Sequence, residues 1–206
     1  MKLIVIDRDC MMSQDADVHE HGASAWHTHD SAIAEIARLN QSDYQVVVTS
    51  NQPGIAKEQF DMKTLNAVHN KLHRAAQALG AHIDAIFFCP HAASDDCDCR
   101  QPKPGMLQAI GKRFDLSLKY VAVVGDTLPV LQAAFAVGSV PYLLLSKTGL
   151  RTKEKGGLPP STIVMQDLRA VVDSLNQREQ LAVEMVEAAR HALHKKNNFS
   201  FKRIQP

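Results

Sequence analysis

Short runs of apolar, mostly β-branched residues recur along the chain, and each run ends in polar residues. Unbroken apolar runs of this length are typical of strands that are buried on both faces of a parallel sheet. The sequence therefore predicts five buried strands, which cover residues 3–6, 45–49, 83–88, 121–124 and 140–145.

Helical periodicity fills the gaps between these runs. Apolar residues three and four positions apart predict five helices, the first of which is capped by Asp30 or Ser31 and begins after it. The others cover residues 61–80, 106–114, 129–138 and 167–175. Strands that alternate with helices predict an α/β fold, a three-layer, Rossmann-like parallel sheet with helices on both faces.

The pattern changes near residue 176. Residues 1–175 are expected to form the folded domain, and residues 176–206 a C-terminal helix and basic tail. Apolar residues at helical spacing lie on this charged segment, which ends in HKKNNFSFKRIQP. Such a stripe is typical of an interaction helix or of a last helix that packs on the domain. We favour packing on the domain.

Composition narrows the function classes. The net charge is +1 over 206 residues, so nothing indicates binding to nucleic acid or to an anionic membrane. No apolar run reaches the length of a transmembrane helix, and the N-terminal run is too short for a signal peptide. A cytoplasmic protein without a membrane partner is expected.

Two aspartates end the first strand, with one arginine between them. The carboxyl ends of parallel strands are where ligands bind in open α/β sheets, so Asp7 and Asp9 should lie at the mouth of a site. Carboxylates this close repel each other unless a cation or a proton lies between them, and Mg²⁺ is a natural partner. Such a pair can supply a nucleophile and a general acid. An ordinary acidic turn is the alternative.

Polar residues also follow two other strands. Ser50, Asn51 and Gln52 come after the second strand, where hydroxyl and amide groups suit a phosphate oxygen. Asp126 follows the fourth strand and is a plausible further metal ligand. The residues after the second strand are also common in turns.

Three cysteines and one histidine crowd into eleven residues. Cys89, His91, Cys97 and Cys99 match the donor set of a structural zinc site of the Cys₃His type. In a reducing compartment such crowding indicates a metal site before disulfides. All four positions are filled by protein ligands, so this Zn²⁺ would hold the loop and take no part in chemistry.

Two cations follow the zinc loop directly. Arg100 and Lys103 would be held still by the zinc and by the prolines beside Lys103. Fixed cations near the aspartates would neutralise charge on a transferring phosphoryl group. A basic loop that balances the acidic residues before it is the other interpretation. A polar stretch with four histidines, residues 10–30, is expected to be a solvated loop near the site mouth, with a transition-metal site as the alternative.

The order of these signals resembles the haloacid-dehalogenase-like phosphatases. The Cys-x-His and Cys-x-Cys pairs followed by Arg-x-Pro are similar to the subfamily of D-glycero-D-manno-heptose 1,7-bisphosphate phosphatases, which is related to histidinol-phosphate phosphatases. The resemblance covers residues 1–175. It implies a Mg²⁺-dependent phosphomonoesterase that works through an aspartyl-phosphate and removes the 7-phosphate of the heptose in the pathway to the lipopolysaccharide core.

The resemblance also implies a role for each matching residue. Asp7 would be the nucleophile and Asp9 the general acid and base. The implied Mg²⁺ ligands are the Asp7 carboxylate, the Asp9 backbone carbonyl and Asp126. Ser50, with Asn51 and Gln52 beside it, would bind phosphate, Arg100 would contact the substrate, and the Cys₃His cluster would bind zinc.

Five positions depart from the family pattern: Cys10 replaces a glycine, Ser13 an asparagine, Gln101 a lysine, Thr127 a lysine and Val130 an acid. Lys103 is a candidate to replace the missing lysine at 101. The departures leave two alternatives open, a hydrolase of histidinol phosphate or another small phosphate ester, and a weakly active or inactive zinc-stabilised paralogue with a binding role.

Overall fold

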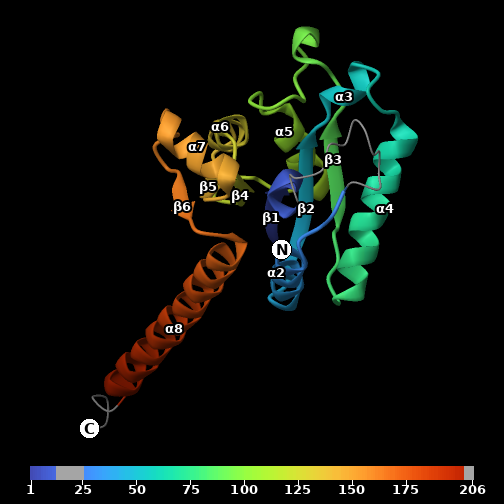
Figure 1. Ribbon diagram of the computed structural model, residues 1–206. Coiled ribbons are helices and arrows are strands. Elements are labelled where there is room, and N and C mark those ends of the chain that lie inside the picture. Colours follow the sequence, from blue (N-terminus) through green and yellow to red (C-terminus); the bar gives the residue numbers. More distant parts are fainter. Residues whose placement is uncertain (13–25, 202–206) are drawn as a thin grey trace.

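The chain forms a single parallel sheet of six strands in the order β3-β2-β1-β4-β5-β6 (Figure 1). The computed structural model describes residues 1–12 and 26–201, and the side chains as far as residue 191. The strands are β1 (Lys2–Asp7), β2 (Tyr44–Asn51), β3 (Ala85–Cys89), β4 (Ala122–Gly125), β5 (Val140–Leu144) and β6 (Ile163–Met165). The five predicted strands are confirmed, and β6 was not predicted.

Helices α2 to α7 lie between successive strands, and α8 follows the last strand, β6. They are α2 (Asp30–Gln41), α3 (Pro53–Ala56), α4 (Met62–Ala78), α5 (Gly105–Phe114), α6 (Leu128–Ala136), α7 (Lys147–Lys155) and α8 (Leu168–Phe201), with short 3₁₀ turns η1 (Arg8–Met11) and η3 (Ala93–Asp95). Helix α4 begins where predicted, since the Asp61 carboxylate accepts the Thr64 N–H. Helix α2 begins after His29 rather than after Asp30 or Ser31.

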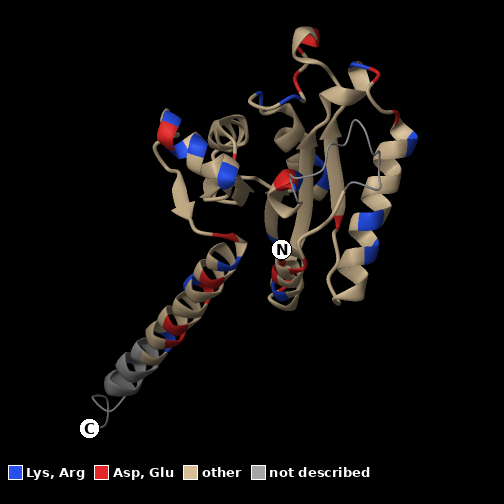
Figure 2. Cartoon of the chain, in the orientation of Figure 1, with Lys and Arg blue, Asp and Glu red and all other residues tan. Residues whose placement is uncertain are grey.

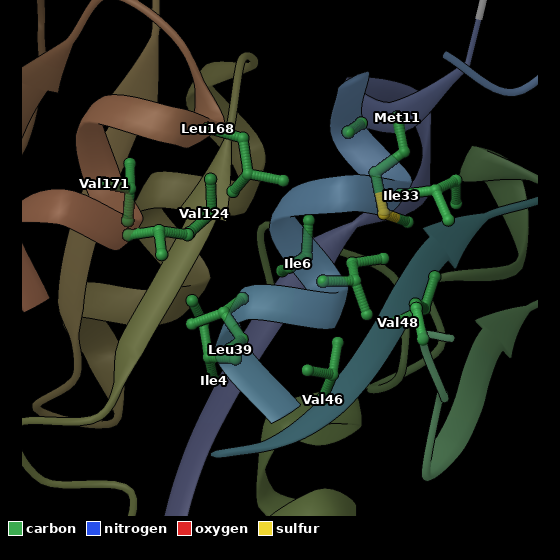
Figure 3. Close-up of a cluster of buried hydrophobic side chains, with 14 of the residues drawn as sticks. Ile4, Ile6, Met11, Ile33, Leu39, Val46, Val48, Val124, Leu168 and Val171 are labelled. Carbon is green, nitrogen blue, oxygen red and sulfur yellow. The ribbon is translucent and has the colours of Figure 1, made fainter. Parts of the chain in front are cut away.

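Two apolar clusters cover the two faces of the sheet. Successive side chains of a strand point to opposite faces, so Ile4 and Ile6 of β1 join one cluster while Leu3 and Val5 join the other. The first cluster contains residues of α2, α4 and the start of α8, part of which is shown in Figure 3. The second contains residues of α5 and α6. The predicted three-layer architecture is confirmed.

Helix α8 is continuous through residue 176 and projects away from the sheet (Figure 1). Its first turns are buried through Leu168, Val171 and Val172. Further along, Leu181, Val183, Met185 and Val186 are all more than half exposed, and charges of both signs surround them (Figure 2). The expectation that this segment packs on the domain was wrong for residues 181–186. No described helix is long and apolar enough to cross a bilayer.

The histidine-rich stretch is only partly described. Residues 13–25 lie outside the described part of the chain, so the predictions for Ser13 and for two of the four histidines, His19 and His21, fall outside the described residues. Its ends are held together, because Met12 and Thr28 form an antiparallel bridge and the His29 N–H donates to the Met11 carbonyl at 3.0 Å. The two ends of this stretch therefore meet directly beside the carboxyl end of β1.

Candidate active site

Two buried aspartates meet where the strand order of the sheet reverses. Asp7 is the last residue of β1 and Asp126 follows the last residue of β4, and these strands are neighbours with Ile6 opposite Val124. The remaining strands lie outward from this central pair. A crevice at such a switch point is the usual ligand site of an open α/β sheet, so the predicted position of both residues is confirmed.

A thiol completes this cluster. The carboxylates of Asp7 and Asp126 and the Cys10 sulfur all lie within 4.8 Å of one another. Burial, followed by the charges of Asp9 and Asp126, raises the pKa of Asp7 well above its ordinary value. Burial, with Asp9 as the main charged neighbour, also raises the pKa of Asp126. Like charges that are buried together disfavour ionisation, so a bound cation would stabilise the ionised carboxylates of this cluster.

Helix α7 fixes the orientation of Asp126. The Ser146 hydroxyl donates to Asp126 Oδ2 at 2.7 Å and accepts the Gly149 N–H at 3.0 Å, so one side chain caps the helix and holds the carboxylate. The Thr152 hydroxyl donates to the Asp126 carbonyl at 2.8 Å. Asp126 Oδ1, which is buried, has no hydrogen-bond partner among the described residues. This oxygen is therefore available to a ligand.

Asp9 lies on the 3₁₀ turn η1 and is held by its neighbour Arg8. The Arg8 guanidinium donates to Asp9 Oδ1 from Nε at 3.1 Å and from Nη2 at 2.8 Å. Arg8 itself is buried and its guanidinium carbon lies 3.9 Å from the ring centroid of Trp26. The Asp9 side chain is 47% exposed, which leaves it accessible to a substrate at the mouth of the site.

The end of β2 contributes hydroxyl and amide groups. Thr49 is opposite Asp7 in the register of β1 and β2, so Ser50 lies one residue beyond the position opposite Asp7. The Ser50 hydroxyl is buried and has no hydrogen-bond partner among the described residues. An unsatisfied buried hydroxyl is costly unless a ligand or water completes it, which agrees with the predicted phosphate-binding position.

Asn51 connects β2 to the loop that follows the cysteines. Its Oδ1 accepts the Gln101 N–H and its Nδ2 donates to the Gln101 carbonyl, both at 3.2 Å. The Gln101 side chain is 3% exposed, and its Nε2 has no partner among the described residues. Gln101 is thus a candidate ligand-binding residue that the sequence analysis treated only as a departure from the family pattern.

The other predicted phosphate-binding residues contact the protein. The Gln52 side chain donates to the Asn51 carbonyl at 3.1 Å, and the Arg100 guanidinium donates to the His91 carbonyl at 3.3 Å. The Lys103 ammonium donates to the Asp96 carbonyl at 2.8 Å and pairs with the Asp96 carboxylate at 2.7 Å. Lys103 therefore balances acidic groups of its own loop, and a contact with phosphate remains a prediction.

The four predicted zinc ligands converge. The distances between their donor atoms are 3.6 Å for Cys89–His91, Cys89–Cys97 and Cys97–Cys99, and 3.3 Å for His91–Cys99 and Cys89–Cys99. A tetrahedral zinc site, with bonds of about 2.3 Å to sulfur and about 2.0 Å to nitrogen, places its donors roughly 3.5–3.8 Å apart. The donor set therefore fits a zinc ion closely, with the histidine bound through Nδ1.

Paired carboxylates at the central strand ends, with a buried hydroxyl on the neighbouring strand, define a haloacid-dehalogenase-like phosphatase. Comparison with known proteins narrows the class. A family model described as polynucleotide kinase 3 phosphatase matches residues 3–129. The D-glycero-beta-D-manno-heptose-1,7-bisphosphate 7-phosphatase of Bordetella bronchiseptica is 45% identical over 177 residues, which are 86% of this chain and 99% of the relative.

Two further comparisons agree with this. The corresponding protein of Pseudomonas putida is 38% identical over 175 residues, which are 85% of this chain and 99% of the relative. A crystal structure of the B. bronchiseptica D,D-heptose 1,7-bisphosphate phosphatase, in complex with magnesium and phosphate, covers 86% of this chain and 99% of that chain, with a TM-score of 0.82 and 45% identity. The chain belongs to the family of D-glycero-D-manno-heptose-1,7-bisphosphate 7-phosphatases.

Sequence reasoning missed Ser146 as well as Gln101. Ser146 follows an apolar strand run directly, as Ser50 does, so the same signal was present for both serines. Gln101 had no such signal, because glutamine is usually exposed and this one is buried only by the fold of the cysteine loop against Asn51.

Proposed function

We propose that this chain is a Mg²⁺-dependent phosphomonoesterase that removes the 7-phosphate of D-glycero-D-manno-heptose 1,7-bisphosphate, with the β anomer as substrate. The observation that carries the proposal is the approach of the Asp7 and Asp126 carboxylates at the centre of the sheet, with Asp9 beside them. The names of the relatives support the heptose as substrate, since the β anomer occurs in both.

The cation site fits Mg²⁺ because carboxylate and carbonyl oxygens are the ligands this ion prefers. The Asp7 carboxylate, the Asp9 backbone carbonyl and Asp126 would hold it, and the unpartnered Asp126 Oδ1 is a ready donor. When bound, Mg²⁺ neutralises charge on the phosphoryl oxygens. The magnesium and phosphate of the B. bronchiseptica structure support this assignment.

The reaction follows from the positions of the carboxylates. An Asp7 oxygen attacks phosphorus, the bond to the sugar oxygen breaks, and Asp9 gives its proton to that oxygen. Asp9 then takes a proton from water, which attacks the aspartyl-phosphate and releases inorganic phosphate and the Asp7 carboxylate. The Ser50 hydroxyl, the Gln101 amide and Arg100 would bind the phosphoryl oxygens, because the first two groups are buried near the nucleophile without partners.

We also propose that the Cys₃His cluster binds a structural Zn²⁺. Cys89 ends β3 opposite Asn51 of β2, and Arg100 and Gln101 follow Cys99 directly. A metal there would fix the loop against the phosphate-binding end of β2. The catalytic unit would comprise residues 1–175, which contain every predicted site residue. The thiols of this cluster, free in the structure, would stay reduced in a cytoplasmic location.

Turnover of a substrate panel tests the proposal. The panel contains heptose 1,7-bisphosphate, histidinol phosphate, an aryl phosphate and a 3′-phosphorylated oligonucleotide, with and without Mg²⁺. We expect the highest kcat/KM for the heptose, only with Mg²⁺. A higher value for another ester would refute the substrate. Phosphate binding without turnover would favour the alternative of an inactive paralogue with a binding role. The residues that motivate this alternative are Gln101 and Val130, both of which are buried.

The Asp126 carboxylate is expected to destabilise the metal-free fold at neutral pH. Its raised pKa means that folding disfavours the charged form, so the penalty is present above the unfolded pKa of about 4 and vanishes below it. Asp126→Asn keeps an acceptor for Ser146 and removes the charge. We expect its metal-free Tm at pH 7 to exceed that of the wild type by about 2–4 °C, with no gain near pH 3.

Calorimetry with and without Mg²⁺ checks this expectation. Mg²⁺ should raise the Tm of the wild type at pH 7 and have little effect on Asp126→Asn. Glu154→Gln, which removes an exposed acid from α7, serves as the control and should behave like the wild type. A metal-free Asp126→Asn protein that melts below the wild type at pH 7 would contradict the account.

A further inference from the structure

Cys10 introduces a soft donor into a site built from oxygen. Cys10 lies on the 3₁₀ turn η1, three residues after Asp7. Its sulfur lies within 4.8 Å of carboxylate oxygens of both Asp7 and Asp126. The second observation is Asp126 Oδ1, which is buried and has no hydrogen-bond partner among the described residues. Three donors, from the end of β1, from η1 and from the residue after β4, thus lie close together.

The cluster differs from a magnesium site in its chemistry. Mg²⁺ requires near-ideal octahedral oxygen coordination, and a thiolate offers it little. Zn²⁺ and ions like it bind thiolate and carboxylate together, with short bonds and low coordination numbers. Val130, which is buried and packs against Gly125, offers no oxygen donor beside Asp126. The Cys10 sulfur therefore adds a soft donor to a pair of carboxylates.

We propose that Asp7, Cys10 and Asp126 form a binding site for a soft divalent cation such as Zn²⁺, which competes there with Mg²⁺. The two ions would compete because both need Asp7 and Asp126. On binding, the sulfur forms a bond to the metal and releases its proton to solvent, without change in oxidation state. The ion would occupy the carboxylate that serves as nucleophile, so the consequence for the proposed phosphatase is inhibition.

A cation can reach this site from solvent. Cys10 and Ser146 both line a cavity of about 430 Å³ between the start of α2 and the carboxyl ends of β5 and β6. Exposed His29 lines the same cavity. The thiol is therefore only partly enclosed, and it is reached through the same cavity as Ser146, the residue whose hydroxyl donates to Asp126.

Metal stoichiometry tests the binding site without reference to activity. The probe is Zn²⁺ alone, measured by equilibrium dialysis and elemental analysis on the full chain, with Cys10→Ala and Cys10→Ser as variants. We expect two zinc ions per wild-type chain, one in the Cys₃His cluster and one at Cys10, and one ion per chain in both variants. Excess Mg²⁺ should remove only the second ion. The affinity for this ion should fall at least on the order of 10- to 100-fold in the variants.

Cobalt gives a spectroscopic check on the same samples. With zinc in the Cys₃His cluster, added Co²⁺ should produce a thiolate charge-transfer band in the wild type and none in Cys10→Ala. One zinc ion in the wild type, or two in both variants, would overturn the proposal. Circular dichroism shows whether the variants fold. If Cys10→Ala does not fold, Cys10→Ser, which is closest in shape to the wild type, decides whether the thiol binds the second ion.

Inhibition is measured separately, because it rests on the proposed function. In saturating Mg²⁺, wild-type turnover should fall on addition of Zn²⁺, and the concentration that halves it should rise at least on the order of tenfold in Cys10→Ser. If no substrate is turned over, the proposed function fails while the stoichiometry still decides the metal site. Equal sensitivity of wild type and variant would show that the thiol does not hold the inhibitory ion.

Discussion

Replacing Asp7 by asparagine is expected to lower kcat at least on the order of 10⁴-fold, by comparison with the loss of other covalent nucleophiles. An amide oxygen cannot form the acyl-phosphate, because it lacks the negative charge that attacks phosphorus. The change is nearly isosteric and removes a carboxylate whose pKa is raised by burial and then by the charges of Asp9 and Asp126. The variant should therefore fold and melt at or above the wild-type Tm without metal.

A rapid-quench experiment with an activated aryl phosphate tests whether Asp7 is the residue that is phosphorylated. Its leaving group needs no proton, so Asp9→Asn should still be phosphorylated, while the loss of the general base slows release of phosphate. The acid-quenched Asp9→Asn chain should carry one phosphoryl group, and the double variant with Asp7→Asn should carry none. Phosphorylation that persists in the double variant would assign the nucleophile to another residue.

Loss of the zinc cluster is expected to be the second large effect. Cys97→Ser removes one of four ligands, so the purified protein should lose its stoichiometric zinc. The loop from Cys89 to Cys99 then no longer holds Gln101 against Asn51. A displacement of about 1 Å in a positioning group can cost on the order of 10²-fold in rate, and we expect a loss of that size in kcat/KM.

The matched control lies on the same loop. Ser94→Ala changes an exposed side chain between the ligands and should keep both zinc and activity. Thermal melts should show a lower Tm for Cys97→Ser only, since metal binding by the folded state contributes to its stability. Full activity in protein that lacks zinc would show that the cluster does not position the phosphate-binding loop.

Much of the sheet could be predicted because its central strands are buried on both faces. An unbroken apolar run such as Val46 to Val48 has few alternatives to a central strand. Asp7, Ser50 and Asp126 could be predicted as site residues because they are polar and follow such runs. The parallel order of the strands brought these residues together. Local sequence thus determined both the elements and the edge of the sheet where the site forms.

Other features depend on contacts that no local pattern contains. Helix α7 is rich in charged residues and lacks an apolar stripe, and β6 has three residues, so neither gave a clear period. Gln101 is buried by the fold of a loop, and Lys103 pairs with Asp96 because both lie on that loop. Helix α8 carries an apolar stripe, but periodicity alone does not say whether a stripe packs within the domain.

Phosphorus NMR of heptose 1,7-bisphosphate during turnover tests the central claim most directly. The spectrum separates the phosphate on carbon 7 from the anomeric phosphate on carbon 1. The account predicts that the carbon 7 signal is replaced by inorganic phosphate only when Mg²⁺ and Asp7 are both present, while the anomeric signal remains. Loss of the anomeric signal in place of the carbon 7 signal would contradict the account. Two unchanged signals, from protein that is folded and holds zinc, would also contradict it.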